Sequence, residues 1–211
     1  MSHNRKHDND DRPFDVLHDK SMISDNYFHL NVSGQIKYAY FPLGPDGSSI
    51  FCRYDVISGP DWEIVSGLKS GITQIAQPGS RMEIVTFNMP IEFTFKSTNP
   101  HGWPQIIFSV YGSNWWRCET SRGYARCHVP LAGSSREIRA PLLIARCKNV
   151  WAAIVNWFSG RNPELKDPKV LGDGSKAKGL STQSYGEIIV QLQSVCRGGT
   201  KMGLDWGQQL S

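Results

Sequence analysis

The sequence predicts an all-β protein, an antiparallel β-sandwich of about eight strands with one short inserted helix. Apolar residues recur at every second position in several short segments, the spacing that places them on one face of a strand. Glycine (20 residues) and proline (12 residues) are spread along the chain, as the turns of a sandwich require. Helical spacing of apolar residues is seen at 148–158, where Gly160 would follow as the C-cap.

Each expected strand is a run of alternating apolar and polar residues bounded by turn residues. The first two, residues 28–32 and 36–41, flank Ser33-Gly34, which predicts a short hairpin or bend between them. Residues 72–75 show a weaker pattern. The other expected strands, in chain order, are residues 50–57, 82–87, 91–95 and 106–110, a strand containing Cys127 and His128, and residues 137–144 and 187–195.

The clearest alternation lies between residues 87 and 112, in two segments that flank a turn. Phe93 and Phe95 share one face of the first segment, and Phe108 and Val110 share one face of the second. The turn between them, STNPHGWP, holds two prolines and Gly102, so it cannot continue either strand. If the two strands pair as a hairpin, Phe93 and Phe108 face one core. Gly102 in the turn is a candidate for a positive φ. The predicted structural core residues are Phe93, Phe95, Phe108, Val110, Trp103 and Trp151.

The order of these segments resembles the second half of a calcium-binding C2 sandwich. It runs from an aromatic strand through a turn, an I-x-F-x-V strand and a polar loop to Gly-Tyr-Ala-x-x-His-Val-Pro-Leu. The resemblance implies aspartates two and four residues after the last strand valine, where they would hold calcium. This chain has Gly112 and Asn114 there. We therefore expect a C2-like architecture without that metal chemistry.

Elsewhere the acidic residues do not gather into a calcium site, which needs clustered carboxylate oxygens from two loops. The loop at 111–121 offers Glu119 as its one acid. Asp46, Asp55 and Asp61 could line another loop, but no second cluster joins them, so we interpret them as turn formers. The sequence predicts no metal site and no cofactor.

Several separated motifs identify a family. FTFKSTNPHGWPQIIFSVYG (93–112) and GPDWEIVSGLKSGITQI (59–75) resemble the B9-domain family, and the match extends through RGYARCHVP (122–130), WFSGRNPELKDPKV (157–170) and SYGEIIVQL (184–192). Among the three paralogues, the chain is most similar to the one usually numbered first. Two features depart from the family pattern: a polar leader of 25 residues and a tryptophan-rich loop, SNWWRCETS, at 113–121.

Length and composition bound the domain organisation. At 211 residues the chain suits one domain, and we expect a disordered polar leader at 1–25, a B9 (C2-like) domain at 26–196 and a C-terminal tail at 197–211. The leader holds four Lys/Arg and six Asp, so the rest of the chain carries a net charge of +6. That mild excess does not predict a nucleic-acid binder.

Targeting and cysteine usage favour a soluble cytoplasmic protein. No apolar run approaches the ~20 residues that span a bilayer, and the polar N-terminus lacks the apolar region of a signal peptide. The five cysteines are odd in number and widely separated, which indicates reduced thiols.

No catalytic constellation is visible, so we do not expect an enzyme. The G-x-S-x-G, H-E-x-x-H and paired C-x-x-C patterns do not occur. Residues 172–176 superficially resemble a phosphate loop but lack its spacing. Cys127 and His128 are adjacent on an expected strand, where neighbouring side chains point to opposite faces and cannot act together.

Two surface signals favour binding to a partner. Trp115 and Trp116 stand beside Arg117 in a loop, and tryptophan and arginine are the residues that anchor interfaces. Residues 145–180 hold seven Lys/Arg against three acids, next to Trp157. Such a basic segment suits an acidic partner or anionic lipid headgroups, although a solvated face has the same composition. The candidate interface residues are Trp115, Trp116, Arg117, Trp157, Arg161, Lys166 and Lys169.

The resemblance also implies a function. B9-domain proteins are understood as non-catalytic subunits of a complex at the ciliary transition zone and basal body, associated with the cytoskeleton. There they assemble with each other and with tectonic-type membrane proteins, gate ciliary membrane protein composition, and support ciliogenesis and Hedgehog-type signalling. The alternative is a calcium-independent peripheral membrane module that binds anionic lipid. Neither reading involves nucleic acid.

Overall fold

The computed structural model describes residues 27–45, 49–113, 119–131, 133–145, 165, 167–172, 182–199 and 203. Almost all of them belong to antiparallel strands. The strands are β1 (Phe28–Tyr40), β2 (Ile50–Ile57), β3 (Trp62–Gly67), β4 (Ser70–Ile72), β5 (Ile84–Ser97), β6 (Gln105–Ser113), β7 (Glu119–His128), β8 (Ser135–Ala145) and β9 (Thr182–Arg197), with a 3-10 helix, η1 (Pro168–Gly172), before β9.

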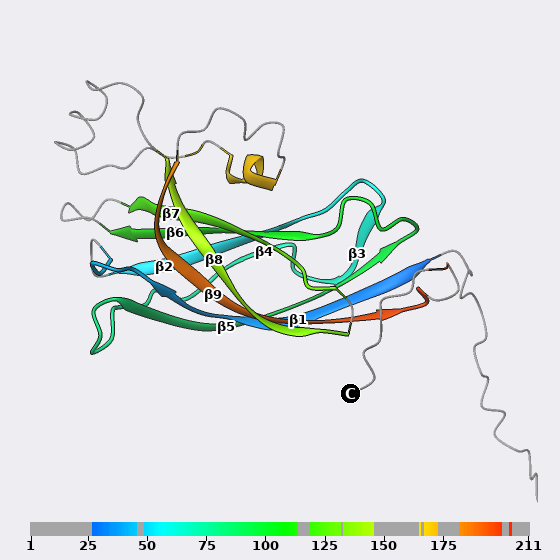
Figure 1. Cartoon of the computed structure of the whole chain (residues 1–211), viewed down its shortest axis with the longest axis horizontal. Coiled ribbons are helices and arrows are strands. Elements are labelled where there is room, and N and C mark those ends of the chain that lie inside the picture. The colour runs from blue at the N-terminus through cyan, green and yellow to red at the C-terminus, as the bar shows by residue number, and fades with distance from the viewer. Residues whose placement is uncertain are drawn as a thin grey trace, which may run out of the picture.

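The nine strands form one sheet, in the order β3-β5-β1-β9-β8-β7-β6-β2-β4, which folds over into two layers. Figure 1 shows β5, β1 and β9 in one layer, with β6, β7 and β2 in the other. The layers are joined through β8, which pairs along most of its length with β9 and, among the described residues, pairs with β7 at Tyr124 opposite Leu143. The predicted all-β antiparallel sandwich is confirmed.

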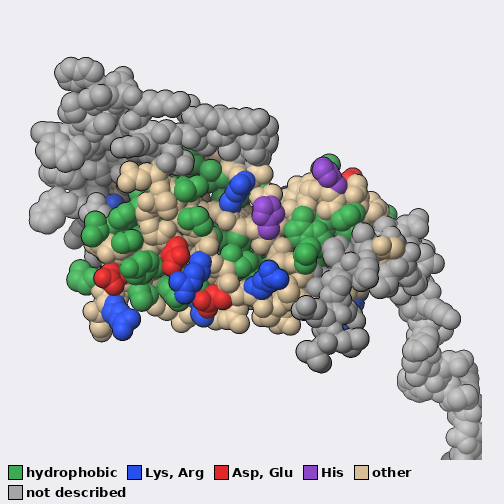
Figure 2. Space-filling view, in the orientation of Figure 1, with side chains coloured by type: hydrophobic (Ala, Val, Ile, Leu, Met, Phe, Trp, Pro, Cys, Tyr) green, Lys and Arg blue, Asp and Glu red, His purple; other side chains and the backbone are tan. Residues whose placement is uncertain are grey.

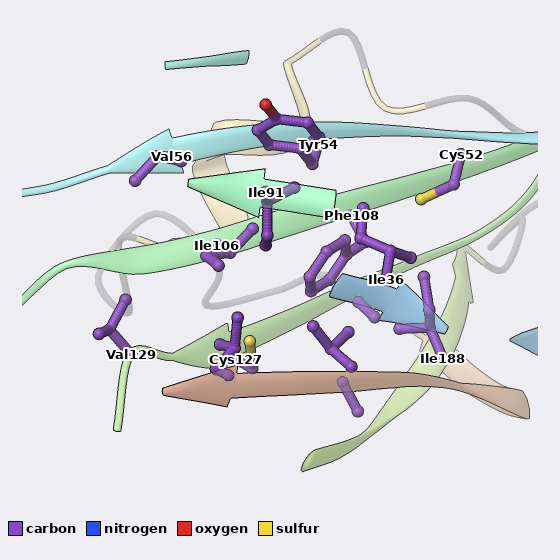
Figure 3. Close-up of a cluster of buried hydrophobic side chains, with 14 of the residues drawn as sticks. Ile36, Cys52, Tyr54, Val56, Ile91, Ile106, Phe108, Cys127, Val129 and Ile188 are labelled. Atoms are coloured by element: carbon purple, nitrogen blue, oxygen red, sulfur yellow. The ribbon is translucent and has the colours of Figure 1, made fainter. Parts of the chain in front are cut away.

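The core lies between the two layers, where each long strand buries one face. Phe93, Phe95, Phe108 and Val110 are at most 1% exposed. Figure 3 shows Phe108 from β6 in one cluster with Ile36 and Ile188, which come from the opposite layer. The largest fully buried side chains are Tyr124, Phe28, Phe41, Phe87, Phe93, Phe95, Phe108, Leu30, Ile36, Ile50, Ile106 and Ile107.

The hairpin considered between the two strands of residues 87–112 is wrong. β5 pairs with β1 and β3, whereas β6 pairs with β2 and β7, so residues 98–104 carry the chain from one layer to the other. Phe93 and Phe108 still share one core, because each points from its own layer into the space between the two layers. Alternation shows which face of a strand is buried, and it does not show which strand is the neighbour.

The turn expected at Ser33-Gly34 is also wrong, because β1 runs unbroken through it with a bulge between Ile36 and Tyr38. Gly34 lies where β9 approaches closely: a Cβ there would meet the carbonyl oxygen of Gln191. The glycine is therefore required by the close approach of β9 rather than by a turn.

Other boundaries shift. The strand expected at 50–57 is confirmed as β2, those at 137–144 and 187–195 lie within β8 and β9, and the weak strand at 72–75 is displaced to β4. The strand expected at 82–87 continues into the next one as β5, despite a positive φ at Asn88 (47°). β3 was not predicted. The helix expected at 148–158 and its Trp151 lie outside the described residues.

Two tryptophans close one end of the sandwich. Their rings meet edge to face, with 5.2 Å between the centroids of Trp62 and Trp103. Trp62 donates its indole N–H to the carbonyl of His101 (2.8 Å), and Trp103, half-buried against the core, donates to the carbonyl of Val129 (2.8 Å). These bonds fix the path of the chain between the layers.

Gly102 makes that crossing possible. Its φ is +70°, as predicted, and a Cβ there would lie 2.6 Å from the Cα of Gly59, whose backbone N–H donates to the Gly102 carbonyl (2.8 Å). A side chain would meet both a backbone conformation that L-residues avoid and a neighbouring backbone that cannot yield.

We expect Phe93→Ala and Phe108→Ala each to lower the free energy of unfolding by about 3–5 kcal/mol, because each removes a fully buried ring and leaves a cavity. Urea denaturation followed by circular dichroism measures the change. Leu43→Ala is the control, since Leu43 is 88% exposed. A similar loss in all three variants would contradict this account of the core.

We expect Gly102→Val to lower the free energy of unfolding by about 1–3 kcal/mol or more, from backbone strain and the contact with Gly59. Gly79→Val is the matched control, because no atom lies within 4 Å of a Cβ built at Gly79. The two unfolding midpoints are compared in urea. Equal midpoints would mean that the Gly59–Gly102 contact relaxes freely.

Candidate interaction surfaces

Among the seven candidate interface residues, the structure describes Lys169 and places it on η1. Its ammonium lies 3.3 Å from Oδ1 of Asp55 on β2, and its backbone N–H donates to Oδ1 of Asp167 (3.0 Å). The positive charge that favoured an interface thus has an internal carboxylate partner. The other six, Trp115, Trp116, Arg117, Trp157, Arg161 and Lys166, lie outside the described residues.

η1 is docked on the outer face of the layer that contains β2, β6 and β7. Arg126 on β7 donates to the carbonyl of Leu171 (2.7 Å), and the backbone N–H of Leu165 donates to the hydroxyl of Tyr124 (3.2 Å). Leu171 is buried against Ile107 and Tyr124, in a second apolar cluster outside the main core. Both faces of β6 are therefore covered at this point.

This docked segment belongs to a long excursion of the chain between β8 and β9. The excursion leaves β8 after Ala145 and enters β9 at Thr182, and these two residues are paired. Within it, η1 lies so close to β2 that a Cβ at Gly172 would meet Cδ1 of Ile57. The excursion thus connects two paired strands of one layer through a contact with the other.

The carboxylates considered for calcium are separated. Asp55 faces Lys169, and Asp61 accepts a hydrogen bond from Asn99 (3.4 Å). Gly112 pairs with Ile50 in the β2–β6 ladder, while Asp46 and Asn114 lie outside the described residues. Within the described ranges, no three His, Cys, Asp or Glu side chains come close enough to share a metal ion.

Two thiols are inert by burial. Cys52 and Cys127 project into the core, and the loss of solvent raises the pKa of both, that of Cys127 to about 12. Both thiols therefore stay protonated at neutral pH and are poor nucleophiles. His128 follows Cys127 on β7 but is exposed on the opposite face, as predicted. The pair cannot act as a nucleophile and base.

The outer face of the other layer carries opposite charges in pairs. Lys37 lies 2.7 Å from Glu137 and Arg139 lies 3.4 Å from Glu187, across the β1, β9 and β8 strands. The hydrogen bond from Lys37 holds the pKa of Glu137 below its ordinary value. Figure 2 shows basic and acidic side chains interspersed on the visible face rather than gathered by sign.

A pocket of about 470 Å³ opens near the start of the β1–β2 loop. Tyr185 lines it and donates its hydroxyl proton to the carbonyl of Gly44 (3.0 Å). Arg122, 5% exposed, donates to the carbonyl of Ser113 (3.3 Å). Sequence reasoning missed the pocket because its walls come from separate segments. It is lined by Phe41, Leu43, Gly44, Pro45, Arg122, Ile144 and Tyr185.

No helix among the described residues is both long enough and apolar enough to cross a membrane. What the described residues form is an antiparallel β-sandwich with a tightly packed core, charge-paired outer strands and one docked 3-10 segment. These features define a class of domain, and comparison with known proteins defines the family.

The sequence profile of the family described as "Ciliary basal body-associated, B9 protein" matches residues 30–195. "B9 domain-containing protein 1" of Drosophila melanogaster is 49% identical over 189 residues, which cover 86% of this chain and 78% of that protein. The human protein of the same name is 35% identical over 188 residues (89% and 91%). Human "B9 domain-containing protein 2" is 25% identical over 187 residues (83% and 98%).

The chain belongs to the B9-domain family, whose members are ciliary basal body-associated proteins. Its identity is higher to the relatives named protein 1 than to the one named protein 2, as the motifs predicted. Among solved structures, a C2 domain of a plant extended synaptotagmin 1 aligns with a TM-score of 0.39 and 12% identity, over 78% of this chain and 93% of that one.

We expect titration of calcium into the purified protein to give no saturable heat below the millimolar range, because Gly112 offers no carboxylate and Asp55 and Asp61 are engaged elsewhere. Isothermal calorimetry in chelator-treated buffer measures it, with magnesium as the comparison ion. Saturation at micromolar calcium would overturn the expectation.

Proposed function

We propose that this chain is a non-catalytic subunit of the ciliary transition-zone complex of the tectonic type. In that role it assembles with the other B9-domain proteins and with tectonic-type membrane proteins. The assembly gates ciliary membrane protein composition and supports ciliogenesis and Hedgehog-type signalling. The observation that carries the proposal is the family match over residues 30–195.

The chemistry of the described residues suits assembly better than catalysis. The buried thiols of Cys52 and Cys127 are protonated, and on the outer strands Lys37 is paired with Glu137 and Arg139 with Glu187. What remains for recognition is shape, exposed apolar side chains and backbone edges, the features by which interaction modules bind other proteins.

The lipid alternative receives no support from the described part of the basic segment. Lys169 is held to Asp55 at 3.3 Å, so its charge is already partly balanced before any headgroup approaches. The contribution of Arg161 and Lys166 stays a prediction, since both lie outside the described residues.

We expect the full-length tagged chain to co-purify with the other two B9-domain proteins of the same organism when all three are co-expressed. The expected complex survives 0.5 M salt, because contacts between apolar side chains and backbone groups are screened little. Vesicles with and without phosphatidylserine are co-sedimented with the chain over the same salt series. If the chain sediments with anionic vesicles at low salt but co-purifies with neither relative, the lipid alternative is favoured instead.

The role of Trp115 and Trp116 is tested in the same assay. If this pair anchors a partner, Trp115→Ala with Trp116→Ala weakens co-purification by at least tenfold and leaves the melting temperature within a few degrees. Phe108→Ala removes a core ring, so it is expected to lower the melting temperature. A double tryptophan variant that unfolds while its folded fraction still binds would place both residues in the core.

A further inference from the structure

The sheet ends at β4, and this edge is longer than its three residues. The backbone follows β2 from Lys69 to Ala76: Val56 donates to the Lys69 carbonyl, Thr73 donates to Cys52, and Ala76 exchanges hydrogen bonds with Ile50. Since backbone groups of successive residues point to opposite sides of a strand, the N–H and C=O groups of Ser70 and Ile72 point away from β2. They form an open row of donors and acceptors, with no strand beyond them among the described residues.

Three aliphatic side chains along this edge are exposed, and on the neighbouring strand β2 Arg53 lies opposite Ile72 and Asp55 opposite Ser70. Leu68 is 68% exposed, Ile72 is 52% exposed and Ile75 is 67% exposed. Between residues 64 and 76 the one charged residue is Lys69. An uncharged edge flanked by exposed aliphatic side chains favours a strand whose own side chains are uncharged, because a charge set down beside them would lose its water.

The other open edges of the sandwich are protected. β3 covers β5 from Phe93 to Ser97, and the uncovered remainder contains Pro90 and the bulged Asn88, with φ 47°. β3 itself has a bulge between Ile64 and Ser66. Proline, bulges and charges are the devices that stop strands from adding to an edge. The edge at 69–76 holds no proline and no acidic residue. It carries Lys69 at its beginning and one extra residue between Thr73 and Ala76, which lie opposite Cys52 and Ile50, so its regular part is residues 69–73.

We propose that the edge at residues 69–76 is a docking site for an extended segment of a partner protein, which adds a strand to β4 and packs aliphatic side chains beside Ile72. The inference rests on the proposed function, since the partner is sought among the proteins with which this chain assembles. Pairing of this kind takes its affinity from backbone hydrogen bonds and its specificity from alternate side chains.

The test measures binding of the full-length chain to each of the other two B9-domain proteins by biolayer interferometry. Ile72→Lys sets a charge beside the aliphatic side chains of the added strand and weakens binding at least tenfold, whereas Ile72→Val preserves it. Val195→Lys is the matched control: Val195 is 44% exposed, but its strand, β9, is paired on both edges. It changes binding less than twofold. Hydrogen exchange in the complex shows new protection of the Ser70 and Ile72 amides.

Each failure has its own reading. If the wild-type chain binds a relative and Ile72→Lys binds equally well, or the two amides exchange as in the free chain, the docking edge is wrong and the proposed function stands. If the wild-type chain binds neither relative, both fall. If Ile72→Lys instead abolishes self-association in ultracentrifugation or capture by anionic vesicles, the occupant is a second copy or a membrane, and the proposal is overturned.

Discussion

Packing of side chains between the two layers is the interaction on which the rest of the structure depends. Backbone hydrogen bonds hold strands together within a layer, but among the described residues the ladder between β8 and β7 consists of one pair, Tyr124 and Leu143. The layers are therefore held face to face chiefly by the rings and branched chains between them. Burial of such side chains is worth about 1.5–3 kcal/mol each, before the entropy of ordering them is subtracted.

This constraint explains why the sequence predicts the class of fold well and its topology poorly. A strand that buries one face must alternate, so Phe93 with Phe95 and Phe108 with Val110 can be found by inspection. Alternation carries no information about the neighbour in the sheet, so β5 and β6 were considered as a hairpin although they lie in opposite layers. The turn predicted at Gly34 was wrong for a related reason. The sequence alone does not distinguish a glycine required by a close neighbouring strand from one required by a turn.

The candidate site shows the same division. Counting charges along residues 145–180 selected Lys169, but only the fold brings Asp55 of β2 within 3.3 Å of it. The outer cluster consists of Leu171, Ile107 and Tyr124, which are far apart in the chain. No local sequence pattern predicts that these three residues contact each other. β3 escaped prediction because it is short and its bulge interrupts the alternation that would mark it. Long-range contacts, rather than composition, decide which charges remain available to partners.

The excursion between β8 and β9 has an architectural consequence. It departs and returns at one paired position, Ala145 opposite Thr182, so the register of the sheet does not depend on how many residues the chain spends in between. Residues could be added or removed there while every strand keeps its partner. The footprint of η1 on Ile57, Arg126 and Tyr124 sets the limit to this freedom. Outside the family-like motif at 157–170 and the contact of η1, the loop can therefore change in length without altering the pairing of any strand.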